Sequence, residues 1–401
     1  MKIALVCPAS LPATQFGGIL FLFVDLAREL SEIGHEIKIF TTDLDFANNP
    51  KSFNKKLPRR EKIGKFEIIR SHVWFSIQLF YVNPGMYFQM MKDESEVIHT
   101  IGVRSFQSFV AAIISKKKNI PLIISDQGGL TTHPDLKKDG ILKNILYEIQ
   151  KPMMNFVIKN AEKIIVANKY EEEIFGELNA QEKTIIVKNG INLSDFKLQK
   201  NNFKKKYSIE KPFILFVGRF NKVKGVDTLI QSLIQIKNEK IIEEIKVVIM
   251  GVDFGFQNEM LKMIKDNQLE DIILIIKNPP REDVIAAYES SEFLVLPSRW
   301  ELSPLTPLEG FAFKKAVIST KAHGIPFTIS DNENAILVEP NNPKKLSEAI
   351  LTLIKDEDRK IELGLSGFKL VQDTCNSKNM AKNTLEVYNS LINKTNKTIR
   401  T

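Results

Sequence analysis

Short apolar runs alternate with segments of helical periodicity along most of this chain. Runs that favour strands lie at 2–7, 36–41, 67–72, 97–99, 121–125, 163–167, 184–187, 212–218, 246–250, 272–276, 292–296 and 316–319. Helical patterns lie at 18–33, from 83 onwards, at 226–237, 256–267, 281–290 and 305–313, and after 373. Strands that alternate with helices build mostly parallel sheets with crossover helices, so the pattern predicts an α/β fold.

The alternation stops and then restarts near the middle of the chain. The segment 194–211 is polar, rich in lysine and weakly periodic, which is typical of a linker. We therefore expect two Rossmann-like, doubly wound domains that face a central cleft. The expected parts are a first domain at 1–195, a linker at 196–211, a second domain at 212–375, and a helix and tail at 376–401. In such folds, ligands bind at the carboxyl ends of the strands.

Composition narrows the class of protein. The 401 residues are 43% hydrophobic and 26% charged, which is ordinary for a globular protein of two domains. The only cysteines, Cys7 and Cys375, stand near opposite ends of the chain, so we expect neither a disulfide framework nor a metal cluster, and a cytoplasmic location. The apolar start at 1–8 is too short for a signal peptide. The uncharged stretch 73–91 is interrupted by polar residues and a turn, so no spanning helix is expected.

The formal net charge of +8 favours an anionic partner. Seven basic residues crowd the segment 51–65 against Glu61 alone, and smaller clusters lie at 116–118 and 204–206. The aromatic-interleaved motifs of nucleic-acid-binding proteins do not accompany them, so we expect no nucleic-acid partner. Two interpretations of 51–65 stay open, namely an ordinary solvated surface and contact with an anionic membrane.

Common nucleotide motifs are missing from the sequence. It has no G-x-G-x-x-G after a strand, no P-loop and no G-x-S-x-G, which argues against the dinucleotide, P-loop and hydrolase classes. Instead, Gly218-Arg219 ends an expected strand, and Lys224-Gly225 opens the next helix. A guanidinium, an ammonium and a helix amino terminus in one small volume suit a diphosphate.

Two glutamates follow a later strand. Glu301 lies in the loop after that strand, and Glu309 lies about two turns farther along the chain, on a helix expected to start near Pro304. Carboxylates accept hydrogen bonds from hydroxyl groups, so such a pair is suited to hold a sugar or a ribose. An exposed loop acid and an exposed helix acid are the alternative explanation.

These motifs together resemble the retaining glycosyltransferases of the GT-B fold, of the group 1 or family 4 type. The resemblance rests on motifs that occur in the expected order, namely Gly17-Gly18, Gly34-His35-Glu36, Lys188-Asn189-Gly190-Ile191-Asn192 with Phe196, Gly218-Arg219 with Lys224-Gly225, and the pair Glu301 and Glu309. It covers nearly the whole chain. It implies a GT-B fold and the transfer of a hexose-type sugar from a nucleotide-sugar with retention of configuration.

The resemblance also implies a role for each matched residue. Arg219 and Lys224 would bind the diphosphate of the donor, Glu309 would hold the ribose hydroxyls, and Glu301 would lie at the donor sugar. The remaining expected site residues are Gly17 and Gly18 beside the phosphate, Asn278 near the base, and Ser303, Pro304 and Leu305 around the sugar and phosphate.

The chain departs from the family pattern in two places. The family often reads E-G-F or E-P-F where this chain has Glu301-Leu302-Ser303, which leaves the identity of the donor sugar open. The family also often has a histidine where this chain has Gln127, and a glutamine cannot carry a proton. We expect Asp126 or His133 to take over that role, with His99 as another candidate, unless no base is needed there.

Two apolar segments of the first domain add to the membrane hypothesis. The helix start 19–24 is apolar on all faces, and the run 73–81 is rich in aromatic residues. Core packing is the alternative explanation for both. With the basic segment 51–65, they indicate an acceptor side close to lipid.

We therefore expect a metal-independent glycosyltransferase without a cofactor. The donor would be linked to UDP or GDP, and the acceptor would be a glycan, a lipid-linked saccharide or a polyprenyl lipid, as in the synthesis of cell-envelope glycans. The expected location is cytoplasmic, with peripheral contact to the inner face of the membrane as a further hypothesis. A nucleotide-sugar-binding protein that has lost catalysis, or another GT-B enzyme such as an epimerase or phosphorylase, is the alternative.

Overall fold

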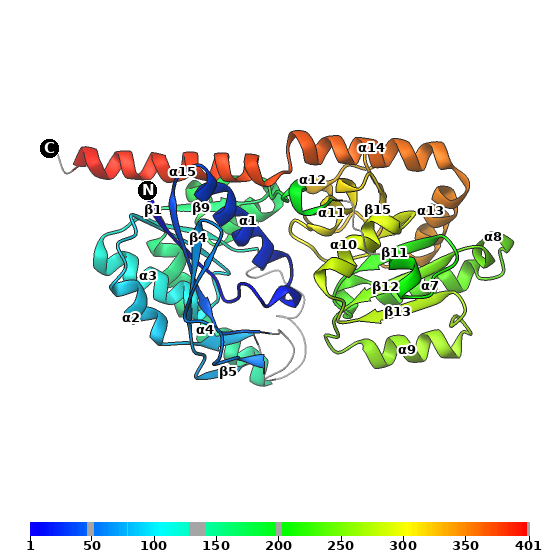
Figure 1. Cartoon of the computed structure of the whole chain (residues 1–401), viewed down its shortest axis with the longest axis horizontal. Helices are drawn as coiled ribbons and strands as arrows, with labels where there is room; N and C mark the ends of the chain where they lie inside the picture. The colour runs from blue at the N-terminus through cyan, green and yellow to red at the C-terminus, as the bar shows by residue number, and fades with distance from the viewer. Residues whose placement is uncertain (46–51, 78, 128–140, 198–202, 399–401) are drawn as a thin grey trace. The chain divides into compact units, whose positions relative to one another are not determined.

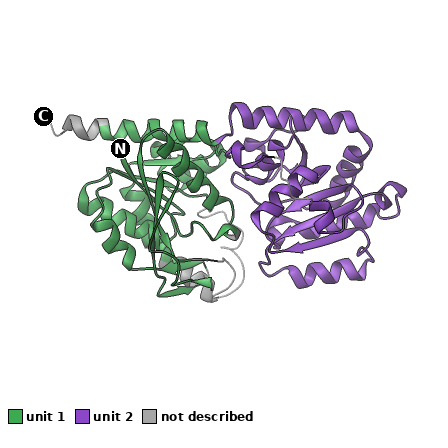
Figure 2. Ribbon diagram, in the orientation of Figure 1, with its two compact units in different colours: residues 1–190, 377–401 green, residues 191–376 purple. Residues whose placement is uncertain are grey.

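The chain forms two compact units in the computed structural model, which describes residues 1–45, 52–77, 79–127, 141–197 and 203–398. Unit 1 contains residues 1–190 and 377–401, and unit 2 contains residues 191–376 (Figure 2). The chain thus leaves unit 1 after Gly190 and returns to it at Ser377. Within unit 2, Phe203 begins the short helix α6 (Phe203–Lys206) and is buried.

Unit 1 is built on an eight-stranded sheet with the order β10-β9-β8-β7-β1-β2-β4-β3. Its strands are β1 (Lys2–Val6), β2 (Glu36–Thr42), β3 (Arg60–Ile63), β4 (Phe66–Ser71), β7 (Val97–Ile101), β8 (Leu122–Ser125), β9 (Lys163–Val166) and β10 (Thr184–Ile186). All pairs are parallel except β3 with β4. In the register, Leu5 lies opposite Ile39 of β2 and His99 of β7. The first half therefore forms the parallel sheet that its apolar runs predict.

Helices cover both faces of this sheet (Figure 1). They are α1 (Gly18–Glu32), α2 (Gly85–Met91), α3 (Phe106–Lys118), α4 (Ile141–Asn160), α5 (Lys169–Glu177) and α15 (Ser377–Thr398). Helix α1 lies between the sheet and α15, with Leu22, Phe23 and Val24 all buried. Packing on two sides explains why the start of α1 is apolar all round, so this helix does not support the lipid-contact hypothesis.

Unit 2 has a six-stranded, wholly parallel sheet with the order β13-β12-β11-β14-β15-β16. Its strands are β11 (Phe213–Val217), β12 (Lys246–Gly251), β13 (Ile273–Lys277), β14 (Phe293–Val295), β15 (Ala316–Thr320) and β16 (Ile336–Val338). Its longer helices are α7 (Val226–Ile236), α9 (Gln257–Asp266), α10 (Arg281–Ser290), α11 (Thr306–Ala312), α13 (Pro343–Lys355) and α14 (Glu357–Asp373), with the short α8 (Lys240–Glu243) and α12 (Ile325–Thr328) between them. Because helices cover the sheet, β11 reads Phe-Ile-Leu-Phe-Val without alternation.

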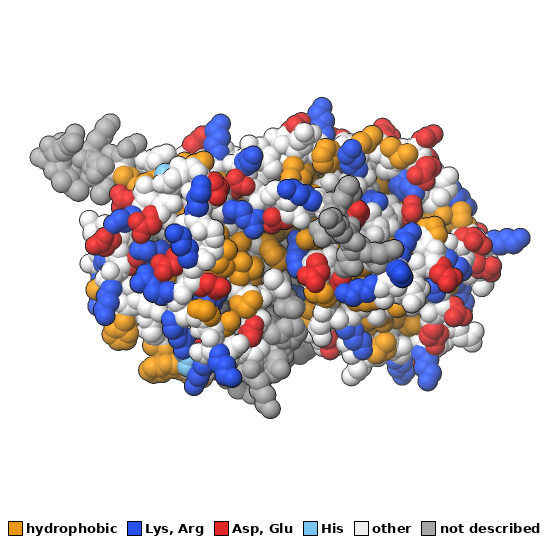
Figure 3. Space-filling model, viewed as in Figure 1, with side chains coloured by type: hydrophobic (Ala, Val, Ile, Leu, Met, Phe, Trp, Pro, Cys, Tyr) orange, Lys and Arg blue, Asp and Glu red, His pale blue; other side chains and the backbone are white. Residues whose placement is uncertain are grey.

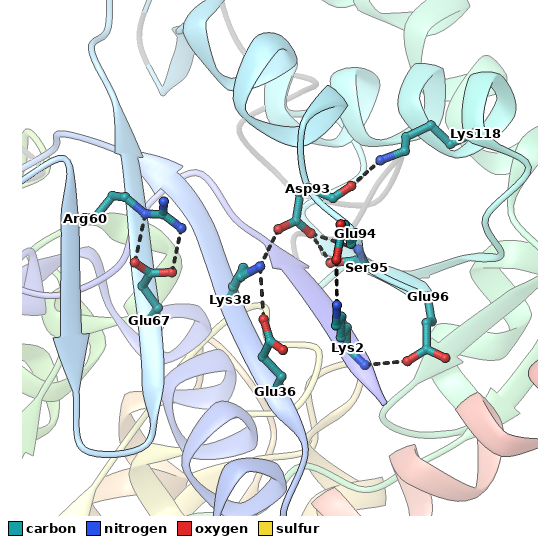
Figure 4. Close-up of polar contacts among 10 residues, drawn as sticks. All are labelled: Lys2, Glu36, Lys38, Arg60, Glu67, Asp93, Glu94, Ser95, Glu96 and Lys118. Carbon is teal, nitrogen blue, oxygen red and sulfur yellow. Dashed lines mark hydrogen bonds and ion pairs between the residues drawn. The ribbon is translucent and has the colours of Figure 1, made fainter.

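A charged cluster closes the amino-terminal edge of the sheet in unit 1 (Figure 4). The Lys38 ammonium lies 2.7 Å from Asp93 Oδ1 and 3.1 Å from Glu36 Oε1. Burial alone would raise the pKa of Asp93, but hydrogen bonds from Lys38 and Ser95 more than offset it, and the pKa is lowered. Farther out, Lys2 pairs with the exposed Glu94. Ligands of doubly wound folds bind at the carboxyl ends of the strands. This cluster lies at the opposite edge, so we interpret its ion pairs as stabilising the sheet.

Charges of both signs are interspersed over the face of the molecule drawn in Figure 3. The lysines 116–118 close the last turn of α3, where positive charge complements the helix dipole. Among the described residues, no helix combines the length and the apolarity that crossing a membrane requires.

Candidate functional site

The carboxyl ends of β11 and β14 form the topological switch point of unit 2. From β11 the chain continues outwards through β12 and β13, whereas from β14 it continues the other way through β15 and β16. The two loops that follow β11 and β14 touch each other: a Cβ added at Gly225 would lie 1.9 Å from the carbonyl oxygen of Pro297. Ligands of doubly wound sheets bind at such a point. The fold thus brings together the two motif groups that stand far apart in the sequence.

The first loop carries the two expected diphosphate ligands. The guanidinium carbon of Arg219 lies 4.5 Å from the centre of the Phe254 ring, which supports its planar face. Asn221 caps the short helix Lys222–Lys224, because its side chain accepts a hydrogen bond from the Lys224 N–H at 3.0 Å. Gly225 then takes a left-handed conformation with φ of 68°, and α7 begins. A local turn therefore fixes both cations near the start of a helix.

The second loop carries Glu301, which forms an ion pair with Lys224. Ser298 Oγ donates a second hydrogen bond to the same carboxylate oxygen at 2.9 Å. The side chains of Lys224 and Glu301 are 27% and 14% exposed, so the pair is reached by solvent. Such a pair can open to offer the ammonium to a phosphate and the carboxylate to a hydroxyl.

Arg299 fixes the second loop to the first. Its Nη1 and Nη2 atoms each lie 2.7 Å from a carboxylate oxygen of Asp227 on α7, and its backbone N–H donates to Val223 at 2.7 Å. A bidentate arginine–carboxylate pair defines orientation as well as distance. Arg299 is therefore a positioning residue for Glu301.

Glu309 lies in a different environment from the one the sequence predicts. It is buried in the first turn of α11, which begins at Thr306, close to the expected start. Arg281 donates to its two oxygens at 2.7 and 3.3 Å, and Tyr288 Oη donates at 2.7 Å. Burial and the neighbouring Glu309 raise the pKa of the Tyr288 hydroxyl. Three donors occupy most of the carboxylate, which leaves one of its acceptor positions.

The other expected residues of unit 2 lie at the same edge of the sheet. Asn278 directly follows β13, in a left-handed conformation, and its N–H donates to Gly251 at 2.8 Å. Ser303 Oγ accepts a hydrogen bond from Thr328 at 3.3 Å. Pro304 is half-buried, and the side chain of Leu305 is buried, so Leu305 can contribute only its backbone to a site.

Unit 1 has its own polar constellation at the carboxyl ends of β8, β9 and β10. Asp126 is buried and directly precedes Gln127, which has a left-handed φ of 54°. The amides of Gln127 and Asn189 exchange two hydrogen bonds of 3.0 Å each. The structure therefore pairs Gln127 with a residue that follows β10.

Glu171 on α5 holds this constellation together. Its two oxygens accept hydrogen bonds from the backbone N–H groups of Gln127 at 3.3 Å and Ala167 at 2.7 Å. Burial raises the pKa of the Glu171 carboxyl to about 7, the bond from Ala167 lowers it in part, and the nearby Asp126 raises it further. This buried carboxyl fixes two strand ends at once.

The remaining candidates of unit 1 differ in their placement. His99 is buried inside β7, where Nδ1 lies 2.7 Å from Tyr388 Oη and Nε2 lies 2.8 Å from Ser125 Oγ, and burial lowers its pKa to about 3. Both nitrogens have partners, so this geometry gives His99 a packing role rather than a substrate-binding one. Gly17 has a φ of 108° and precedes Gly18, the exposed first residue of α1. His133 lies outside the described residues.

Sequence reasoning missed three residues that organise these sites. Arg281 follows Asn278-Pro279-Pro280 and begins a helix. Its position shortly after an expected strand end was the sequence signal that could have marked it as a site residue. Glu171 stands three residues after its helix cap, Asn168, which is the spacing of a capping box. Asn189 lies inside the matched Lys-Asn-Gly motif, but its pairing with Gln127 depends on the sheet.

Two doubly wound units with parallel or mostly parallel sheets are the architecture of the GT-B fold. Solved structures agree with this fold. The sucrose-phosphate synthase of Thermosynechococcus elongatus has a TM-score of 0.77 and 19% identity, covering 98% of this chain and 99% of that one. HepE of Anabaena, solved with UDP and glucose, has a TM-score of 0.76 and 17% identity over 97% and 100% of the two chains. The expected fold class is therefore confirmed.

Family comparisons cover both units. The family described as Glycosyltransferase Family 4 matches residues 16–195, and the one described as Glycosyl transferases group 1 matches residues 199–367. An uncharacterized glycosyltransferase of Methanocaldococcus jannaschii is 30% identical over 269 residues, which are 65% of this chain and 66% of that relative. The chain belongs to the group 1 glycosyltransferases.

Proposed function

We propose that the chain transfers a hexose-type sugar from a UDP- or GDP-linked donor to an acceptor with retention of configuration. The observation that carries the proposal is the ion pair between Lys224 and Glu301 beside Arg219, at the switch point of unit 2. HepE, which shares the fold, was solved with UDP, with UDP and glucose, and with UDP-glucose. These titles support a nucleotide-sugar as the donor class.

The chemistry follows from the charges of the site. When the bond between sugar and diphosphate breaks, negative charge develops on the leaving phosphate. Arg219 and the Lys224 ammonium would stabilise that charge, and Glu301, released from Lys224, would accept hydrogen bonds from the sugar hydroxyls. We propose that these side chains do this without a metal ion.

The acceptor belongs to unit 1 in this proposal. Gln127 and Asn189, whose paired amides lie at the carboxyl edge of the sheet next to the buried Asp126, would contact it. We propose a glycan, a lipid-linked saccharide or a polyprenyl lipid as acceptor, in the synthesis of cell-envelope glycans. The enzyme would work in the cytoplasm, in peripheral contact with the inner face of the membrane.

A panel of nucleotide-sugars tests this function. The purified chain should release nucleoside diphosphate from one donor of the panel, and an added crude lipid or glycan extract should accelerate that release. Proton NMR of the product should show the anomeric configuration of the donor. Donor binding without any release over the whole panel and extract series would instead favour a nucleotide-sugar-binding protein, and release with inverted configuration would contradict retention.

A further inference from the structure

The antiparallel hairpin of β5 (Phe75–Ile77) and β6 (Phe80–Val82) exposes an unusual amount of apolar surface. Four neighbouring large side chains are strongly exposed, namely Trp74 at 71%, Phe75 at 56%, Ile77 at 42% and Leu79 at 46%. Single exposed apolar residues are common on soluble proteins, but four large ones within one short hairpin indicate an interaction surface. Figure 1 shows the hairpin at the end of unit 1 that lies away from α15.

Hydrogen bonds fix the base of the hairpin to the body of unit 1, so its apolar side chains are exposed on an ordered element. The Val73 N–H donates to the buried Asp43 carboxylate at 3.0 Å, and the Trp74 N–H donates to the Val82 carbonyl at 2.8 Å. Gln107 of α3 donates to the Tyr81 carbonyl at 2.8 Å. Strand β6 is thus fixed to the body of unit 1, and β5 is held outwards as its exposed outer strand.

Part of the basic segment lies at this base. The ring of Phe53 packs against Tyr81 of β6 at 5.4 Å, and the Asn54 N–H donates to the Asp43 carbonyl at 2.9 Å. The next residues, Lys55 and Lys56, are exposed, and neither has an ion-pair partner within the described part of the chain. The Arg59 guanidinium, 46% exposed, lies 3.7 Å from the same Asp43 that anchors the hairpin. We call Lys55, Lys56 and Arg59 the basic collar.

The rest of the basic segment lies elsewhere, which corrects the view of 51–65 as one cluster. Arg60 is held by Glu67 through two hydrogen bonds of 2.9 and 3.0 Å. Strand β3 then runs antiparallel to β4 and takes Lys62 and Lys65 to the amino-terminal edge of the sheet, roughly 10–13 Å away. There, Lys65 pairs with Glu32 at 2.6 Å.

We propose that the β5–β6 hairpin and the basic collar form a docking surface for an anionic lipid bilayer. The exposed apolar side chains of the hairpin would enter the interfacial layer of the membrane, where tryptophan and other aromatic side chains are favoured. The collar would face the lipid phosphates, and this charge complementarity selects an anionic bilayer over a neutral one. The inference deepens the membrane contact of the proposed function, but it does not depend on the donor chemistry of unit 2.

Vesicle sedimentation of the full chain tests the proposal. Vesicles of phosphatidylcholine alone are compared with vesicles in which about one third of the lipid is phosphatidylglycerol, at low and high salt. We expect binding to the anionic vesicles at low salt and its loss at high salt. The double variant Trp74→Ser and Phe75→Ser should weaken binding by at least about tenfold, because it removes two inserted side chains.

Charge variants distinguish binding through the basic collar from a general effect of the protein's net charge. Replacing Lys55, Lys56 and Arg59 by Gln should weaken binding by roughly fivefold for each charge. A control variant with Lys62 and Lys65 replaced by Gln removes two basic residues of the same segment and should bind nearly as well as the wild type. Melting curves of the variants confirm their folding, and all of them should keep nucleotide binding in unit 2.

Several outcomes would overturn the proposal. Wild-type protein that binds neither kind of vesicle would show that the hairpin serves another partner, such as an acidic protein. Unchanged vesicle binding of the Trp74→Ser, Phe75→Ser variant, or equal losses in the collar and control variants, would also contradict it. Failure of the donor panel with normal vesicle binding would instead count against the proposed function alone.

Discussion

Replacing Gly225 by Ala should separate the two loops of the unit 2 site. A Cβ at this position would lie 1.9 Å from the carbonyl oxygen and 2.8 Å from the carbonyl carbon of Pro297, both of them backbone atoms. To reach ordinary contact, the loop after β14 must retreat by roughly 1.5 Å. That loop carries Ser298 and Glu301, so the ion pair with Lys224 would open. We expect overpacking to cost about 1–3 kcal/mol, in addition to the strain of a left-handed alanine.

Gly255 provides the matched control for this substitution. It also has a positive φ, of 90°, but an added Cβ would meet nothing within 4 Å. Gly255→Ala should therefore cost only the backbone strain of about 1–2 kcal/mol. In thermal unfolding followed by circular dichroism, each kcal/mol lowers the melting temperature by about 2–4 °C. Gly225→Ala should melt clearly below Gly255→Ala and lose nucleotide affinity. Equal melting temperatures with retained affinity would refute the contact between the loops.

Three further predictions concern charged side chains. Lys224→Ala should lower turnover of the donor by roughly 10²–10³. The control Lys222→Ala loses an exposed pair with Glu259 and should keep normal turnover. Equal activities of the two variants would show that Lys224 is not part of the site. Because the folded pKa of Glu171 is raised from 4.5 to about 7, this group lowers the stability of the wild type as the pH rises from 4.5 towards 7. The melting temperature of Glu171→Gln relative to wild type should therefore rise over that range, and a falling difference would contradict the buried carboxyl. Asp93 has a lowered pKa, so its contribution to stability is present above its ordinary value of 3.8 and is lost as the pH falls below it. Asp93→Asn should lower the free energy of unfolding at neutral pH by about 1–2 kcal/mol, and with it the melting temperature. Replacing the exposed Glu94 by Gln should leave the melting temperature unchanged. Equal changes in the melting temperatures of the two variants would refute the role of the ion pair between Asp93 and Lys38.

The main strands of both units could be predicted because the parallel sheets are buried on both faces, whereas the helices α3, α4, α5, α13 and α14 were not among the expected ones. Continuous apolar runs such as the one in β11 leave little ambiguity, and glycines and prolines mark their ends. The strands β3, β5, β6 and β16 were missed. Strand β3 alternates between exposed and half-buried positions, and β5 is exposed throughout, so neither has an apolar signature. Their pairing partners, not their composition, make them strands.

The part of the site that lies in turns close to strand ends could be predicted from the sequence. Arg219, Lys224 and Glu301 lie in the segments that follow β11 and β14, and parallel strands bring such ends to one edge. The partners of Glu309 were not predictable, because Arg281 and Tyr288 come from another helix and meet it only in the packed unit. Asn83 shows the same limit: it resembles a helix cap in sequence, yet its side chain bonds Ser71 and Gln107.

We propose that the loops after β11 and β14 bind the diphosphate of a nucleotide-sugar. The most direct test is the melting temperature of the full chain with increasing UDP or GDP, in wild type and in Arg219→Ala. A ligand that binds only the folded state stabilises it by about 2.7 kcal/mol at a hundred times its Kd. We expect a concentration-dependent rise with one of the two nucleotides in the wild type and a rise shifted to much higher concentrations in Arg219→Ala. No rise with either nucleotide, or identical rises in both proteins, would contradict it.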